Sequence, residues 1–405
     1  MVWLGILLFL LKLGARRQIT YRLRNYSCFL SHLNALAGTG LSQSPHDDTV
    51  ADLFMLLNYE ELDDLRVKMI RVLIRAKVLE YYRLFAVYYT IAIDGTGVHY
   101  YSYKHCEHCL TKTSSKTGEI LYYHNVLEAK LVTPDGFAFS IATEFIENSD
   151  DYDLNLSIEK QKQDCELKAF KRLAPKLKNT FPQLKICLLL DSLYAAQTVL
   201  SICKQYHWEV IISFKEGSIP TVYQEHCSIR QQQPENFLRW TTPGNANQTI
   251  VWSNGIEYEG HTLALVECRE TVNDGKSNEN KKTFVYLTTI MITKDRARAL
   301  VNEGGRQRWN IEEGFNTQKN QGYELEHVYC SNENASKCLY YCLQIAHTIN
   351  QLFEQGSLIA ALRKKIGSIK NLTFDLLICM LTQPINSATV ESLFTAPFQI
   401  RLNSS

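Results

Sequence analysis

The chain has 405 residues, of which 45% are hydrophobic and 21% charged, and its formal net charge is +1 at pH 7. This composition excludes a disordered chain, and the length exceeds what one core usually serves, so we expect a large domain with an insertion, or two domains. The near-zero net charge excludes a protein coated in cations, so any nucleic-acid site must be a local basic groove. The 12 cysteines show no disulfide framework and fit reduced thiols in the cytoplasm.

Residues 1–84 are predicted to form a helical N-terminal region. Residues 2–12 are its most apolar run, too short to span a bilayer and without the flanking signals of a signal peptide, so we interpret them as a buried helix. Because this run comes directly after the first residue, a natural chain could have begun further upstream. Further helices are predicted from Asp47-Asp48 and over 60–82. The region could bind DNA or serve only for packing.

The pattern changes at residue 85, where an α/β domain is expected to begin. Two short apolar runs, typical of strands buried on both faces, each end in an aspartate, Asp94 and Asp191. The domain is expected to occupy residues 85–219 and, after an insertion, residues 293–355. Its other elements are predicted as strands 121–132, 136–145 and 209–214 and helices 157–179, 192–206 and 334–353.

Residues 220–292 are interpreted as a β-rich insertion between the two parts of this domain. An Asn254-Gly255 pair inside it predicts a hairpin turn. The insertion is completed by two further predicted strands, 261–269 and 283–290, with a polar loop over 273–282 between them. Residues 356–405 form a C-terminal tail whose sequence indicates no function.

A helix predicted to begin near Gly304 carries charged residues along one stripe. At about 100° per residue, Arg308, Glu312 and Lys319 return to within about 40° of one another. A carboxylate between two cations suits an enzyme that acts on phosphates with the help of a metal ion. The alternative is an Arg–Glu surface pair with an unrelated lysine.

Asp94, Asp191 and Glu312 are the candidate catalytic residues. Taken singly, Asp94 could belong to a turn, and Asp191 could cap the helix that follows it. Three carboxylates buried together would be costly unless a cation neutralised them. Two Mg²⁺ ions, or Mn²⁺ in their place, would neutralise the site, activate a water and stabilise the leaving oxygen of a phosphodiester.

The chain resembles the DDE transposases of bacterial insertion sequences, in the group marked by a Tyr-x2-Arg-x3-Glu-x6-Lys signature. The resemblance covers about residues 5–355. It implies an α/β, RNase H-like fold: a mixed sheet with flanking helices and a β-rich insertion before the helix that carries the glutamate. The segments that carry it are I-A-I-D-G-T-G (91–97), L-L-L-D-S (188–192), R-W-N-I-E…K (308–319) and I-A-H-T-I-N-Q-L (345–352).

On this resemblance the three carboxylates would bind Mg²⁺, and Arg308 and Lys319 would contact DNA phosphates. It also implies a homodimer that pairs two terminal inverted repeats and joins them to target DNA in the bacterial cytoplasm. One departure is Gly305, where the signature has a tyrosine that would contact DNA. Two alternatives stay open: an RNase H-like nuclease that cuts without joining, and a DNA-binding relative that has lost catalysis.

Cys106 and Cys109 are separated by two residues, the spacing of a zinc-binding cysteine pair. His105, His108 or His124 could complete a tetrahedral site with them. Because only one such pair is present, the alternative is a turn with reduced thiols and incidental histidines.

Three further features each have a functional and a structural interpretation. Trp309 could stack on an unpaired base or belong to the core. Asp164 and Glu166 are interpreted as part of a solvated helix face. A set of lysines could form a phosphate-binding edge or only a solvated face, namely Lys160, Lys162, Lys168, Lys171, Lys176 and Lys178.

Overall fold

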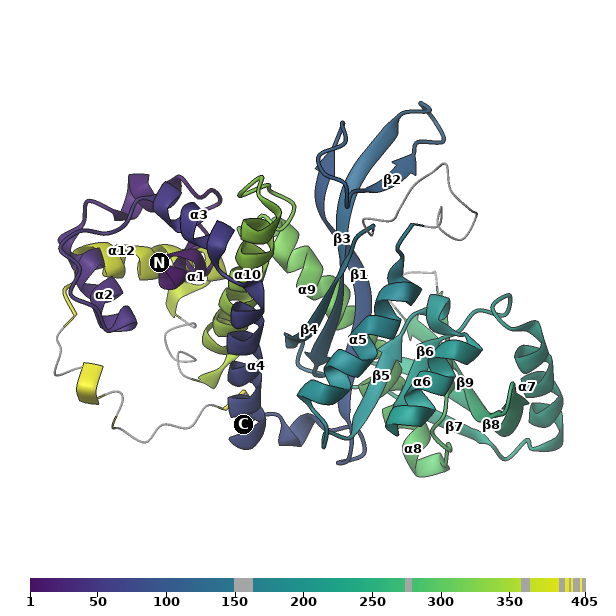
Figure 1. Ribbon diagram of the computed structural model, residues 1–405. Coiled ribbons are helices and arrows are strands. Elements are labelled where there is room, and N and C mark those ends of the chain that lie inside the picture. The colour runs from purple at the N-terminus through teal and green to yellow at the C-terminus, as the bar shows by residue number, and fades with distance from the viewer. Residues whose placement is uncertain are drawn as a thin grey trace. The chain divides into compact units, whose positions relative to one another are not determined.

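The computed structural model describes residues 1–148, 163–273, 279–357 and 365–385, together with residues 390–392, 395 and 401–402. The described chain is a mixed α/β protein with a ten-stranded sheet, N-terminal helices and C-terminal helices (Figure 1). The predicted α/β class and the helical N-terminal region are therefore confirmed. Parts of the predicted helix 157–179, with Lys160 and Lys162, of the loop 273–282 and of the tail lie outside the described residues.

The chain folds into two compact units. Unit 1 comprises residues 1–79, residues 98–100 and the described residues from 315 onward, and unit 2 comprises residues 80–97 and 101–314. The N-terminal and C-terminal helices belong to unit 1. The sheet belongs to unit 2, apart from a short piece of one strand.

Unit 1 is built from helices around a buried apolar one. Helix α1 (Val2–Leu10) is apolar around its whole circumference, and residues 4–9 are buried, which confirms the predicted buried helix. The long helix α10 (Glu333–Gln355) packs against it and is capped by Asn332, whose side chain accepts a hydrogen bond from Ala335 N (3.0 Å). The other helices of unit 1 are α2 (Ser27–Ala37), α3 (Asp47–Leu56), α4 (Tyr59–Arg75) and α12 (Ile369–Thr382).

Helix α3 begins at Asp47, where the sequence predicts a helix. Its cap is the preceding residue, His46, whose Nδ1 accepts a hydrogen bond from Asp48 N (3.2 Å). Asp47 and Asp48 lie in the first turn, where the helix dipole favours negative charge. Among the described helices, none combines the length and the apolar character that crossing a membrane requires.

Unit 2 contains the sheet, in the order β2-β3-β1-β5-β6-β10-β9-β8-β7, with β4 paired to β3. Its centre is parallel, because β5 (Ile186–Leu190) pairs with β1 (Tyr89–Tyr101) on one side and with β6 (Glu209–Ser213) on the other. Every residue of β5 is buried, as expected for a strand covered on both faces. The remaining strands are β2 (Leu110–Thr113), β3 (Ile120–Val132), β4 (Ala138–Ile146), β7 (Phe237–Thr241), β8 (Ala246–Tyr258), β9 (His261–Asn273) and β10 (Glu279–Thr288).

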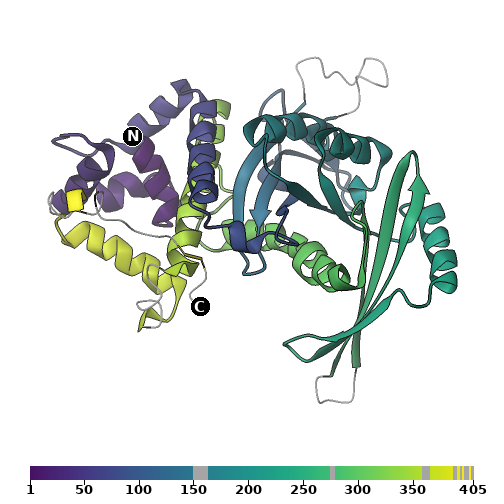
Figure 2. The ribbon, with the colours of Figure 1, turned by 90° about the horizontal axis from the view of Figure 1, so that it is seen from below.

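Helical segments cover both faces of the central strands. Helix α5 (Glu166–Thr180) packs on β3 and β4, and α6 (Gln197–Tyr206) packs on β6. The 3-10 turn η5 (Gly305–Arg308) packs against β5 and β6 and leads into α9 (Trp309–Asn320). Figure 2 shows α5 and α6 on one side of the strands and the segment that leads into α9 on the other.

The predicted β-rich insertion also contains a helix that was not predicted, α7 (Pro220–Gln232), which packs on β8. The turn predicted at Asn254-Gly255 is wrong, because both residues lie inside β8, where the register with β9 shifts. Gly255 has a φ of +78°, as in a β-bulge. The turn between β8 and β9 is Glu259-Gly260, whose φ angles of +47° and +76° fit a two-residue hairpin.

Candidate metal-dependent active site

The register of two parallel strands brings Asp94 and Asp191 together. β1 and β5 are paired up to Ala92 and Leu189, so Asp94 in β1 and Asp191, which directly follows β5, occupy matching positions two residues beyond the last pair. Neighbouring strands lie about 4.8 Å apart. Asp191 Oδ1 also accepts a hydrogen bond from Leu193 N (2.9 Å) and caps a short 3-10 turn. Asp191 can therefore cap this turn and also belong to the site, two roles that the sequence presented as alternatives.

β1 does not end at Asp94, which corrects the prediction that the strand ends there and also excludes the alternative of a turn. The strand continues through Gly95 to Tyr101, and Asp94 Oδ1 accepts a hydrogen bond from Gly95 N (2.9 Å). A Cβ added at Gly95 would lie 2.4 Å from Glu166 Oε1. The carboxylate of Glu166 therefore lies directly against the strand, one residue from Asp94.

Glu166 is a site residue that the sequence did not reveal, because it was interpreted as part of a solvated face. Its side chain is partly buried, and Glu166 Oε2 accepts a hydrogen bond from the buried Tyr194 hydroxyl (3.3 Å). Acidic residues are common in the first turn of a helix, so its position gave no signal of this contact. Asp164, in contrast, pairs with Arg172 (2.6 Å).

Arg308 links Glu312 to Asp94. Its guanidinium lies 2.6 Å from Glu312 Oε1 and 3.6 Å from Asp94 Oδ2, and only 8% of the residue is exposed. The predicted Arg–Glu pair is thus present, but it is part of the carboxylate cluster and not a surface pair. Within the described structure, Arg308 Nε is buried without a hydrogen-bond partner. In this structure the arginine supplies positive charge between two carboxylates.

Two glycines let the segment before Arg308 approach the sheet closely. A Cβ at Gly304 would lie 2.6 Å from the Ile211 side chain in β6, and one at Gly305 would lie 2.5 Å from the Tyr286 ring in β10. Tyr286 is buried. At the position where the transposase signature has a tyrosine, this chain therefore has a glycine that makes room for a tyrosine ring from the sheet.

The carboxylates carry more negative charge than Arg308 neutralises. Burial raises the pKa of Asp94 to about 7, Arg308 opposes the shift, and Glu166 and Glu312 add to it. Burial also raises the pKa of Glu166, against the hydrogen bond from Tyr194 and with help from Asp191. A partly buried group of carboxylates in this condition is stabilised by a divalent cation.

The donor set fits Mg²⁺ or Mn²⁺, because carboxylate oxygens are the protein ligands that these ions take. Among the described residues, the ligand atoms of Asp94, Asp191 and Glu312 do not all lie within 4.8 Å of one another. In this structure the three carboxylates are therefore not arranged around a single ion.

The other predicted DNA-binding residues lie on α9. Trp309 is 56% exposed, so the alternative that it belongs to the core is wrong, and its ring is accessible for stacking. Lys319 pairs with Glu326 at 2.7 Å and is partly exposed. An ion pair of this kind contributes little free energy, so the contact with Glu326 adds little to the stability of the fold.

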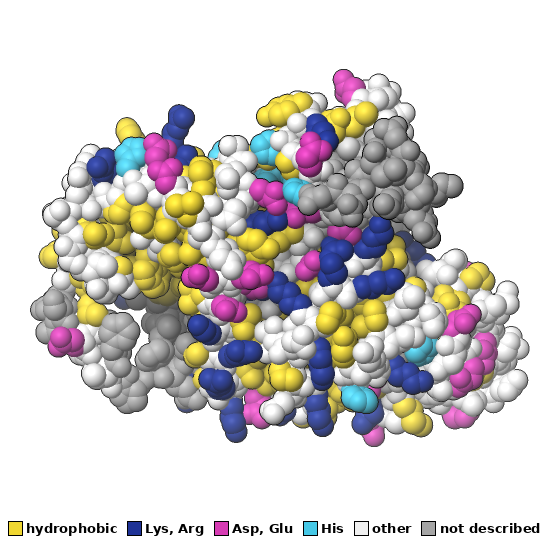
Figure 3. All heavy atoms as spheres, in the orientation of Figure 1, with side chains coloured by type: hydrophobic (Ala, Val, Ile, Leu, Met, Phe, Trp, Pro, Cys, Tyr) yellow, Lys and Arg dark blue, Asp and Glu magenta, His cyan; other side chains and the backbone are white. Residues whose placement is uncertain are grey.

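The described lysines of α5 are mostly engaged with the fold. Lys168, Lys176 and Lys178 each donate a hydrogen bond to a backbone carbonyl, at 2.9–3.0 Å. Lys171 is exposed. Lys and Arg side chains are visible on the face of the molecule that carries α5 (Figure 3). A solvated face therefore describes α5 better than a dedicated phosphate-binding edge.

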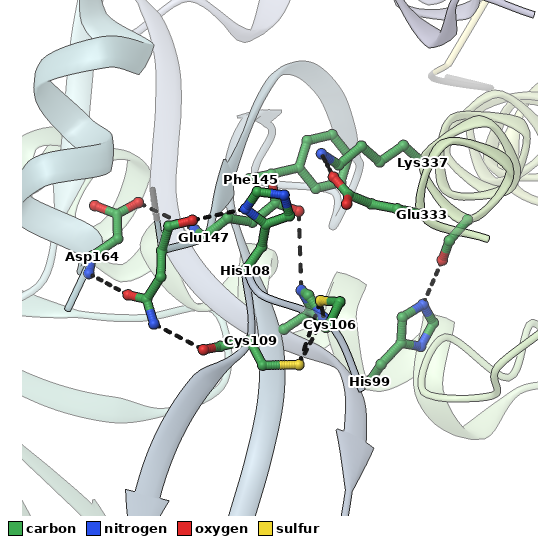
Figure 4. Close-up of polar contacts among 12 residues, drawn as sticks. His99, Cys106, His108, Cys109, Phe145, Glu147, Asp164, Glu333 and Lys337 are labelled. Atoms are coloured by element: carbon green, nitrogen blue, oxygen red, sulfur yellow. Dashed lines mark hydrogen bonds and ion pairs between the residues drawn. The ribbon is translucent and has the colours of Figure 1, made fainter. Parts of the chain in front are cut away.

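The predicted zinc ligands are brought together in part. Cys106, Cys109 and His124 form one cluster, in which the ligand atoms all lie within 4.8 Å of one another. The two cysteines of this cluster are labelled in Figure 4. His105 is outside this cluster, and its ring stacks on a tyrosine ring with centroids 4.3 Å apart. His108 Nδ1 lies 2.9 Å from a backbone carbonyl oxygen.

No known protein family matches this chain, and no curated protein matches it. The geometry of the carboxylates and the resemblance of the short segments are therefore the grounds on which a function can be argued.

The raised pKa of Asp94 sets an expectation for the metal-free protein. Folded Asp94 holds its proton up to about pH 7, whereas an ordinary aspartate loses it near 3.8, so the free energy of unfolding should fall as pH rises between these values. Asp94→Asn cannot ionise and should be more stable than wild type at pH 8, by about 1–3 kcal/mol, with no advantage near pH 4. Urea unfolding of wild type and variant at pH 4 and pH 8, in the presence of a chelator, measures these free energies of unfolding. A variant that is less stable than wild type at pH 8 would contradict the expectation.

Proposed function

We propose that the protein is a DNA transposase that cuts transposon-end phosphodiesters with divalent metal ions and joins the freed ends to target DNA. The observation that carries the proposal is that Arg308 pairs with both Asp94 and Glu312, while Asp191 follows the strand that pairs in parallel with the strand of Asp94. The mixed sheet, its flanking helices and the strands inserted before the Glu312 helix support the RNase H-like architecture that the sequence resemblance implies.

The side chains of the proposed site have different roles. Asp94, Asp191 and Glu312 would hold the ions, which when bound activate a water and stabilise the leaving oxygen. Arg308 fixes the carboxylates of Asp94 and Glu312 through its two ion pairs. The exposed ring of Trp309 can stack on an unpaired base next to them. On the same helix, Lys319 can neutralise a DNA phosphate.

The reaction consists of two phosphoryl transfers. In the first, water attacks the phosphorus at the transposon end, and the transposon's 3′-oxygen leaves as a hydroxyl. In the second, that hydroxyl attacks a target phosphodiester, and the target's 3′-oxygen leaves in turn. Because two ends must reach one target, the proposal includes a homodimer that holds the ends as a pair.

The DNA that flanks the reading frame supplies the test. If the proposal is right, inverted repeats lie on both sides of the frame. Duplexes that carry these repeats should be cut by the full-length protein in the presence of Mg²⁺ and then joined to a supercoiled target plasmid. Sequencing of the junctions identifies the joined strand.

Whether the ends are cut, and whether the cut ends are joined, decides between the alternatives. Cut ends that are never joined, even when precleaved ends with a free 3′-hydroxyl are supplied, would show a nuclease. Specific binding of the repeats without any cutting would show a relative that has lost catalysis. Either result would overturn the transposase proposal.

A further inference from the structure

A group of sulfur and nitrogen donors lies outside the carboxylate cluster. Cys106 and Cys109 lie in the segment between β1 and β2, and His124 lies on β3, the partner of β2. Figure 4 shows the two sulfur atoms turned toward each other. Cys109 N approaches Cys106 O at 3.5 Å, so the two cysteines close a tight turn. Neither cysteine forms a disulfide.

The distances among the three donor atoms match those around a tetrahedral zinc ion. The two Sγ atoms are 3.5 Å apart, and they lie 3.3 Å and 3.4 Å from His124 Nε2. Tetrahedral bonds of about 2.3 Å to sulfur and about 2.0–2.1 Å to nitrogen would place sulfur atoms about 3.8 Å apart and sulfur about 3.6 Å from nitrogen. Each observed distance is within about 0.3 Å of these values.

The surroundings of the three donors also suit a metal ion. Cys109 and His124 are 3% and 9% exposed, whereas Cys106 is partly exposed, so two of the donors are buried and solvent can reach the third. The other ring nitrogen, His124 Nδ1, faces Glu147 Oε1 at 3.9 Å. A carboxylate behind a metal-binding histidine orients the ring and makes its free nitrogen a better ligand.

We propose that Cys106, Cys109 and His124 bind one zinc ion, with solvent at the fourth position and Glu147 orienting His124. The ion would tie the turn between β1 and β2 to β3, across the segment from residue 106 to residue 124. This role is structural and does not depend on the proposed transposase activity, so the two proposals can fail separately.

Metal analysis of the full-length protein tests the site directly. Protein purified without chelator, or incubated with ZnCl₂ and freed of excess metal, should contain about one zinc per chain. Replacement by Co²⁺ should give an absorption band from thiolate-to-cobalt charge transfer, together with the strong visible bands of tetrahedral cobalt. Less than a tenth of an equivalent of zinc after incubation, with no thiolate band, would overturn the proposal.

Variants identify the ligands. Cys106→Ser combined with Cys109→Ser should abolish the cobalt thiolate band and the bound zinc, and Glu147→Gln should weaken zinc affinity about 10- to 100-fold. His108→Ala is the matched control, because His108 lies beside the cluster but contacts a backbone carbonyl. Cys165→Ser is the control for a thiol elsewhere. Loss of zinc in either control, with the protein still folded, would contradict this ligand set.

Discussion

Asp94→Asn, Asp191→Asn and Glu312→Gln should each reduce Mg²⁺-dependent DNA cleavage at least about 10³-fold, a loss of about 4 kcal/mol in transition-state stabilisation. Each change removes one negative charge and one metal ligand but almost no volume. The effect should therefore fall on metal binding and chemistry, while the protein stays folded and still binds the DNA ends.

Single-turnover cleavage of an end duplex, measured alongside binding of the same duplex, separates these effects. Asp295→Asn, the same exchange at an exposed residue in the first turn of α8 (Lys294–Ala299), is the control and should cleave at the wild-type rate. Glu166→Gln should give an intermediate loss, about 10- to 100-fold, because Glu166 adjoins the proposed ligands. A near wild-type rate in any of the first three variants would remove that residue from the site.

Gly305→Ala should lower the free energy of unfolding by about 1–3 kcal/mol, and Gly305→Tyr by more. The added Cβ would lie 2.5 Å from the Tyr286 ring, so either the turn before Arg308 or the ring of Tyr286 must move. The same shift displaces Arg308, so cleavage should fall as well. Restoring the tyrosine of the signature is thus expected to harm this chain.

A double-mutant cycle with Tyr286→Ala isolates the contact. In that background Gly305→Ala should cost less than it does in wild type, with a coupling energy of about 0.5–3 kcal/mol. Gly217→Ala is the matched control, because an added Cβ there meets nothing within 4 Å, and it should change stability by about 0.5 kcal/mol at most. Equal costs of Gly305→Ala in both backgrounds would show that the ring of Tyr286 is not the obstacle.

The central strands could be predicted because their sequence signal is local. A short apolar run ending in an aspartate indicates a buried strand and a polar group at its end, and parallel pairing then brings Asp94 and Asp191 together. The contact of Glu166 with Gly95 could not be predicted, since it depends on where α5 lies against β1. The ion pair between Arg308 and Asp94 depends in the same way on how η5 docks on the sheet.

The sequence was also ambiguous where two nearby positions carried the same kind of signal. Asn254-Gly255 and Glu259-Gly260 both carry a glycine with positive φ, and strand pairing decides that the first is a bulge and the second the turn. The histidine next to Cys106 in sequence is also not the one next to it in space. His124 reaches the thiols because β3 folds back beside β2, whereas His105 stacks on Tyr101.

Cys165 has a practical value that follows from its place in the fold. It is the one exposed cysteine of the twelve, and it directly precedes Glu166 at the start of α5. Buried thiols such as Cys203, whose pKa burial raises to about 12, form little thiolate at neutral pH and react slowly. A thiol-reactive fluorophore should therefore attach first at Cys165. The native chain thus carries its own labelling position, one residue from the carboxylates, for following metal and DNA binding by fluorescence.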